Sequence, residues 1–148
     1  MRLVLASLLC IIPANALLSG NFGEYLFAFT NWGITLTIAH LWCAEYLAYS
    51  TAVERAHYVL FCLSATMNTV STFTYWTLLF EFDMSRPHIA ESSTQQVVQV
   101  LAHLLPINAT IYTIRTMDVR IKLKDFWIIV VLGLVYNAWY YFVTVTLA

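Results

Sequence analysis

The chain has 148 residues, of which 61% are hydrophobic and only 10% are charged. Soluble domains carry about 25% charged residues, so this composition excludes an ordinary soluble domain and predicts a membrane protein. Helices are the expected elements, because open strands would leave backbone groups unpaired in lipid. The formal net charge of −1 gives no indication of a nucleic-acid partner.

The fold class that we predict is all-α, a polytopic transmembrane helix bundle of about five spans that forms one domain over residues 1–148. The predicted spans cover about residues 3–18, 25–49, 57–80, 93–115 and 125–146. The first span follows Arg2 and contains Pro13, and we interpret it as a retained short helix. Its Ala14-Asn15-Ala16 segment also resembles a signal-peptide cleavage site, so a cleaved leader is the alternative.

Three of the predicted spans have polar or small residues at helical spacing, which places them on one face of each helix. They are Thr30, Gly33, Thr37, His40 and Ala44 in the second span, Ser64, Asn68, Ser71 and Tyr75 in the third, and Gln96, Gln99, His103 and Thr110 in the fourth. Polar groups are costly in lipid, so we expect each face to point into protein or into a wet cavity. Packing between helices is the simpler explanation of such faces, and chemistry is the alternative.

Lysine and arginine residues indicate how the bundle is oriented. Five spans place the N-terminus, residues 50–56 and residues 115–124 on one side of the membrane. The cations on that side are Arg2, Arg55, Arg115, Arg120, Lys122 and Lys124. The other side has only Arg86, among Glu24, Glu81, Asp83 and Glu91. This distribution fits the positive-inside rule, although four spans with a cleaved leader would show the same polarity.

Thr30 and His103 form the first pair of residues that could act together in catalysis. A threonine hydroxyl becomes a nucleophile when a base takes its proton, and histidine can act as that base. The spacing of the two residues does not by itself bring them together. The alternative is a structural His103 that is hydrogen-bonded to Asn68, a glutamine or a threonine within the bundle.

A second pair, His40 and His103, could ligate a haem, but two isolated histidines are a weak indication of one. The cysteines Cys10, Cys43 and Cys62 lie singly in apolar runs with no CxxC pair, as packing residues do. We therefore predict no metal site and no cofactor.

The order of several short motifs resembles the androgen-induced, rolling-stone-like family of multi-span membrane proteins. The motifs are Phe29-Thr30-Asn31-Trp32 at the start of a span, then Tyr75-Trp76, Asp83 and Pro87, then His103 before Leu105-Pro106, and last a basic loop and an aromatic-rich span. The resemblance covers about residues 5–145. Three features depart from it. Family members usually have six spans, the loop between the second and third spans is here only a few residues long, and tyrosine, not phenylalanine, precedes Trp76.

Some members of that family are threonine-dependent hydrolases of fatty acid esters of hydroxy fatty acids. The resemblance implies that Thr30 is the nucleophile and that His103 is the essential second residue. Asn68, Gln99, Arg86 and His40 are the candidates for binding a substrate or lipid.

Two functions follow from these observations. A chain with five short-looped spans and almost no soluble mass suits a non-catalytic accessory subunit of a larger membrane complex, which is the function that we predict. The alternative is an intramembrane hydrolase of fatty acid esters. The predicted partners are membrane lipids and other membrane subunits, with no nucleic acid. Complexes with many small accessory spans are commonest in energy-converting membranes, so we favour an organellar, mitochondrial inner membrane over the endoplasmic reticulum.

Overall fold

The computed structural model of the chain describes residues 1–20, 28–46, 50–117 and 122–146. All regular structure in these residues is helical, which confirms the all-α prediction. The five long helices are α1 (Arg2–Leu18), α3 (Phe29–Glu45), α4 (Thr51–Thr74), α7 (Ser93–Met117) and α8 (Phe126–Thr146). The short elements are the π-helical turn η2 (Tyr75–Leu79), α5 (Phe80–Met84), α6 (Pro87–Ala90) and the 3-10 turn η3 (Leu123–Asp125).

The boundaries of α4 differ from those predicted for the third span. The helix begins at Thr51 rather than at residue 57, because the Ser50 hydroxyl caps it by accepting a hydrogen bond from the Val53 N–H at 3.2 Å. Beyond residue 80 the acidic segment that we predicted as a loop contains the short helices α5 and α6. Residues 25–27 and 47–49 of the predicted second span, and Arg120, lie outside the described residues.

Two helices of the described chain are both long and apolar enough to cross a bilayer. They are Ser93–Met117 and Leu123–Phe142, while Arg2–Leu18 is apolar but shorter. Length and composition therefore support an association with membranes. The arrangement in five spans remains a prediction.

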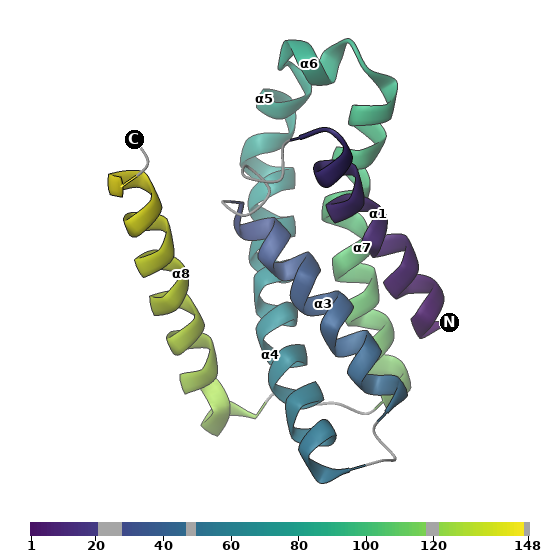
Figure 1. Cartoon of the computed structure of the whole chain (residues 1–148), viewed down its shortest axis with the longest axis vertical. Coiled ribbons are helices and arrows are strands. Elements are labelled where there is room, and N and C mark those ends of the chain that lie inside the picture. The colour runs from purple at the N-terminus through teal and green to yellow at the C-terminus, as the bar shows by residue number, and fades with distance from the viewer. Residues whose placement is uncertain (21–27, 47–49, 118–121, 147–148) are drawn as a thin grey trace.

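Four of the long helices pack into one bundle (Figure 1), in which α3 lies along α4, and α1 and α7 close the opposite side. The apolar centre of this bundle is formed by Ala6, Leu9, Ile12, Ile34, Leu41, Ala102 and Ala109. Beside it, the Asn68 amide nitrogen donates hydrogen bonds to Thr37 Oγ1 at 2.8 Å, to the Pro106 carbonyl at 3.3 Å and to Thr110 Oγ1 at 3.2 Å. Asn68 thereby joins α4 to α3 and α7, and the polar faces of these helices point inward as predicted.

At Gly33, α3 and α4 approach each other closely. A Cβ atom at this position would lie 2.6 Å from Asn68 Oδ1 and 3.2 Å from Met67 Cβ. Both neighbours are fixed, since Met67 is buried and the Asn68 amide has three acceptors around it. An added methyl group therefore has to push the two helices apart.

We expect Gly33→Ala to destabilise the protein by about 1–3 kcal/mol, which is the usual cost of overpacking. The measurement is thermal unfolding of the purified protein in detergent. Gly133→Ala on α8 is the matched control, because a Cβ atom there meets nothing within 4 Å. If both variants melted at the same temperature, the close contact between α3 and α4 would be contradicted.

Helix α8 stands apart from the four-helix bundle (Figure 1). It contacts α4. It also contacts α3 through the ring of Tyr136, whose centroid lies 4.9 Å from that of Phe29 and 5.7 Å from that of Trp32. Among the side chains described on α8, Ile128 alone is buried. Most of its other described apolar side chains are exposed, whereas Ile129, Leu132, Tyr136 and Trp139 are partly covered.

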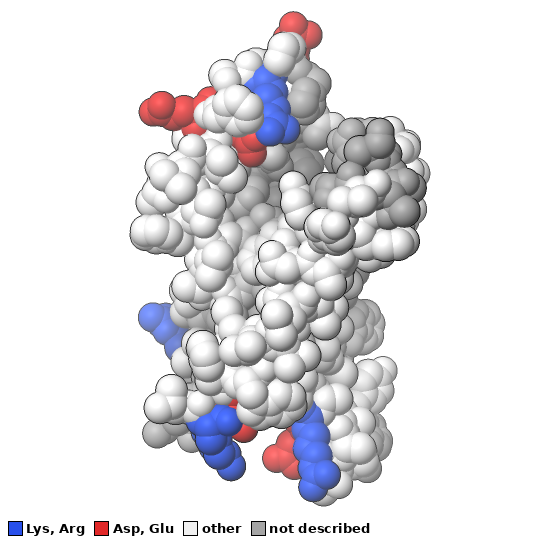
Figure 2. All heavy atoms as spheres, turned by 90° about the vertical axis from the view of Figure 1, so that its left-hand side faces the viewer, with Lys and Arg blue, Asp and Glu red and all other residues white. Residues whose placement is uncertain are grey.

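Charged side chains lie at the two ends of the molecule on the face shown in Figure 2. The acidic residues of α5, and Glu91 just after α6, lie at one end, where Asp83 pairs with Arg86. Lysine and arginine residues, with some acidic ones, lie toward the other end. On this face, a belt in which no described side chain is charged separates the two ends. The exposed apolar residues of α8, including Val130, Val131, Leu134 and Val135, belong to this uncharged part of the chain.

Candidate active site

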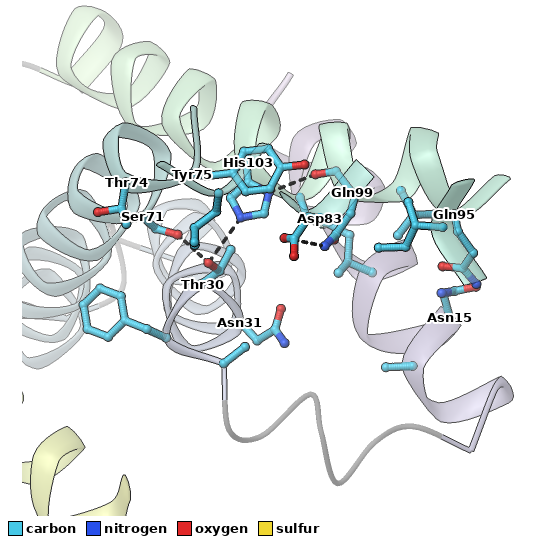
Figure 3. Close-up of a pocket in the computed structure, with 18 of the residues that line it drawn as sticks. Asn15, Thr30, Asn31, Ser71, Thr74, Tyr75, Asp83, Gln95, Gln99 and His103 are labelled. Carbon is cyan, nitrogen blue, oxygen red and sulfur yellow. Dashed lines mark hydrogen bonds between the residues drawn. The ribbon is translucent and has the colours of Figure 1, made fainter. Parts of the chain in front are cut away.

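A cavity of about 600 Å³ opens at the acidic end of the bundle. It lies between the last turns of α1, the first turn of α3, the junction of α4 with η2, and the first half of α7 (Figure 3). Its polar wall comprises Asn15, Thr30, Asn31, Ser71, Thr74, Tyr75, Asp83, Arg86, Gln95, Gln99 and His103. Apolar residues, among them Ile12, Val70, Leu79 and Val98, form the rest of the wall.

Thr30 and His103 meet in this cavity. The Thr30 hydroxyl lies 3.4 Å from Nε2 of His103 and also shares a hydrogen bond with the hydroxyl of Ser71. Thr30 is in the first turn of α3, where the N-cap residue Ala28 supplies no side-chain acceptor.

His103 is oriented by contacts on both sides of its ring. Its Nδ1 lies 2.9 Å from the carbonyl oxygen of Gln99, one turn earlier on α7. A carbonyl oxygen can only accept a hydrogen bond, so Nδ1 carries the proton and Nε2 presents a lone pair to Thr30. The ring stacks on Tyr75, with 3.5 Å between the centroids and an angle of 7° between the planes. Thr72 also donates a hydrogen bond to the His103 carbonyl at 2.9 Å.

The far side of the cavity is built around Asp83, which is largely buried. Its carboxylate accepts hydrogen bonds from Arg86 Nε at 3.1 Å and from Gln99 Nε2 at 3.3 Å. The Arg86 guanidinium also lies over the Phe82 ring, 5.0 Å from its centroid. The Tyr75 hydroxyl is buried and has no hydrogen-bond partner among the described residues. This side of the cavity therefore offers both donors and an acceptor to a polar group.

The predicted site residues fall into two sets. Thr30, His103, Gln99 and Arg86 line the same cavity. Asn68 is instead part of the hydrogen-bonded centre of the bundle.

His40 also lies away from the cavity, fully buried, with 5.7 Å between its ring centroid and that of His57. Phe61 packs on the His40 ring as well, at 5.8 Å. His40 and His103 thus have separate surroundings, and the two histidines do not form a haem-binding pair. Within the described ranges, no three or more histidine, cysteine, aspartate or glutamate residues group closely enough to hold a metal ion.

The wall residues that were not among the predicted site residues include Ser71, Tyr75 and Asp83. Ser71 and Tyr75 share a predicted face with Asn68, so their helical spacing was the available signal. Asp83 follows the π-helical turn, which breaks that spacing.

No family model matches this chain, and no curated protein and no solved structure shows significant similarity to it.

Proposed function

We propose that this chain is a polytopic membrane hydrolase of fatty acid esters, with Thr30 as the nucleophile and His103 as the general base. The main support is the 3.4 Å distance between the Thr30 hydroxyl and the unprotonated Nε2 of His103, beside a cavity of about 600 Å³. A base has to lie within hydrogen-bond reach of the proton that it takes, and distances are often longer before substrate binds. The resemblance to the androgen-induced family designates the same two residues.

The reaction would proceed through an acyl-threonine intermediate. Thr30 Oγ1 attacks the carbonyl carbon of the ester while its proton passes to His103 Nε2. The bond between that carbon and the alcohol oxygen then breaks, and His103 returns the proton to the departing alcohol. Water attacks the acyl-threonine, again with its proton passing to His103. The carboxylic acid leaves, and the proton returns to Thr30.

Ser71 and the Gln99 carbonyl would keep this pair ready for reaction. If Thr30 donates its proton toward His103, the Ser71 hydroxyl is the donor in its contact with Thr30. The Gln99 carbonyl keeps the proton of His103 on Nδ1 and would stabilise the imidazolium that forms during attack. The two contacts thus favour the protonation states that the first step needs.

The five-span arrangement is part of the proposal. The long helices have 17 to 25 residues, or about 26–38 Å at a rise of 1.5 Å per residue, which is comparable to the hydrocarbon layer. The uncharged belt in Figure 2 is what a bilayer-spanning surface requires. Asp83 and Arg86 would then lie near one membrane surface, where the ester groups of lipids and water meet.

An accessory role in a larger membrane complex is the second candidate, and α8 supports it. Among its described side chains only Ile128 is buried, so a wide apolar face is available to lipid or to another helix. Extraction in mild detergent would reveal a stable assembly far larger than the 16.9 kDa chain if this role is correct. The two roles are compatible.

The acyl-threonine intermediate offers a direct test of the hydrolase. The purified protein would be mixed with a 4-nitrophenyl ester of a fatty acid and quenched in acid within the first turnovers. Peptide mass spectrometry should then find the acyl mass on the peptide that contains Thr30. The Thr30→Ala protein, treated in the same way, should show no acyl group on that peptide. Hydrolysis with no acyl group on Thr30 would contradict the proposed mechanism.

A further inference from the structure

An apolar groove runs between α1 and α7 on the outside of the bundle. It is lined by Leu8, Ile11, Ile12, Val98, Leu101 and Leu105, and its volume is about 120 Å³. None of these side chains has a polar atom, and no hydrogen-bonding group is exposed in the groove. A ligand in it would therefore be held by apolar contact alone.

The groove adjoins the candidate active site. Ile12 and Val98 line both the groove and the cavity that contains Thr30 and His103. The cavity thus has a polar side, formed by Asp83, Arg86 and Gln99, and an apolar side at Ile12 and Val98, next to the groove. An ester has the same division, with a polar carbonyl group and an apolar chain.

We propose that this groove binds the acyl chain of the ester whose carbonyl carbon is attacked by Thr30. The inference rests on the proposed hydrolase function and adds the position of the chain. From Val98 to Leu105, α7 rises by seven residues, or about 10 Å, so the groove follows a chain for several carbon atoms.

The groove runs in the same direction as the acyl chains of a lipid in a bilayer would. The cavity lies at the acidic end of the bundle, beside α5 and α6. From there the groove continues toward Leu8 and Leu105, which are nearer the middle of their helices. A lipid whose head group lies at that membrane surface also extends its chains toward the middle of the bilayer. The ester could therefore enter from the membrane in the orientation that it has in the bilayer.

Leu101→Trp tests this position by filling the groove from its rim. Leu101 is 37% exposed and does not line the cavity, so the substitution leaves Thr30 and His103 in place. Leu104→Trp is the matched control, because Leu104 is 38% exposed on the same helix and lies outside the groove. The substrates are the 4-nitrophenyl esters of butyric and dodecanoic acid, and the measured quantity is kcat/KM for each.

We expect Leu101→Trp to lower the ratio of kcat/KM for dodecanoate to that for butyrate by at least about tenfold. Displacing two methylene groups from an apolar site corresponds to a loss of about that size. Butyrate turnover should persist, which shows that the variant is folded. Leu104→Trp should keep the wild-type ratio. Equal ratios in the two variants would overturn the proposed position of the chain.

A cross-linking experiment tests the groove without turnover and separates its failure from that of the proposed reaction. The Thr30→Ala protein would be irradiated with a dodecanoate ester that carries a diazirine near the end of its chain. Label on peptides that contain Leu8 or Leu101 would support the groove, even if the wild-type protein hydrolysed no ester. Label confined to α8 or spread evenly over the outer surface would overturn it.

Discussion

Thr30→Ala should lower kcat for ester hydrolysis by on the order of a thousandfold or more, because no other hydroxyl can replace a lost nucleophile at the same position. The nearest hydroxyl, that of Ser71, is on α4 and contacts Thr30 rather than His103. The measurement is steady-state release of 4-nitrophenol by the purified protein in detergent. Thr30→Ser should retain measurable activity, since it keeps the attacking oxygen.

Thr35→Ala is the matched control for this loss. Thr35 lies on the same helix, and its exposed hydroxyl donates a hydrogen bond to the Asn31 carbonyl at 2.9 Å. This variant should keep wild-type kcat. A Thr30→Ala protein with the activity of Thr35→Ala would show that the hydroxyl of Thr30 has no part in the reaction.

His103→Ala should lower kcat by about a hundredfold to ten-thousandfold, which is the usual contribution of a general base. Nε2 of His103 is the base within reach of the Thr30 proton, so its removal leaves the hydroxyl in its unreactive form. The same assay of 4-nitrophenol release measures the effect.

The double variant Thr30→Ala with His103→Ala shows whether the two residues act as one unit. Residues that share one catalytic step have strongly non-additive effects, so the double variant should be about as slow as the slower single variant. Two losses that multiplied in the double variant would mean that the residues act independently. His103 would then be a packing partner of Tyr75 and not the base for Thr30.

Much of the bundle could be predicted from composition and spacing. The chain is helical because its apolar runs cannot leave backbone groups unpaired, and polar residues at intervals of three and four turn inward for the same reason. Thr37, Asn68 and Thr110, for example, were placed on inward faces, and the structure joins them through the Asn68 amide. The start of α4 was missed, although a serine at position 50 with Glu54 in the turn that follows is a signal for the start of a helix.

The candidate site was harder to predict, because it depends on how far one helix slides along another. The spacing of Thr30 and His103 did not by itself bring the two residues together, and the packing of the helices places the Thr30 hydroxyl 3.4 Å from His103 Nε2. Gly33 permits part of that packing, since any side chain there would collide with Asn68. Spacing alone could not show that His40 faces His57 while Asn68 stays in the centre of the bundle. These positions are properties of pairs of helices and not of one helix.

The π-helical turn Tyr75–Leu79, in which the Phe80 N–H bonds to the Tyr75 carbonyl, changes the phase of the helix that follows. In a regular helix each residue turns by about 100°, so the eight steps from Tyr75 to Asp83 would leave the two side chains about 80° apart. A π turn absorbs one extra residue, and seven effective steps bring Asp83 to within about 20° of the direction of Tyr75. Winding the same residues as an ordinary α-helix would rotate Asp83 by about 100° and turn it away from the cavity, with Arg86 following it. Deleting one residue from the turn should instead remove the π winding and leave Asp83 near its present direction, because seven regular steps also end within about 20° of Tyr75. The polar side of the cavity therefore depends on the winding of a single backbone turn, a dependence that no single side-chain substitution would reveal.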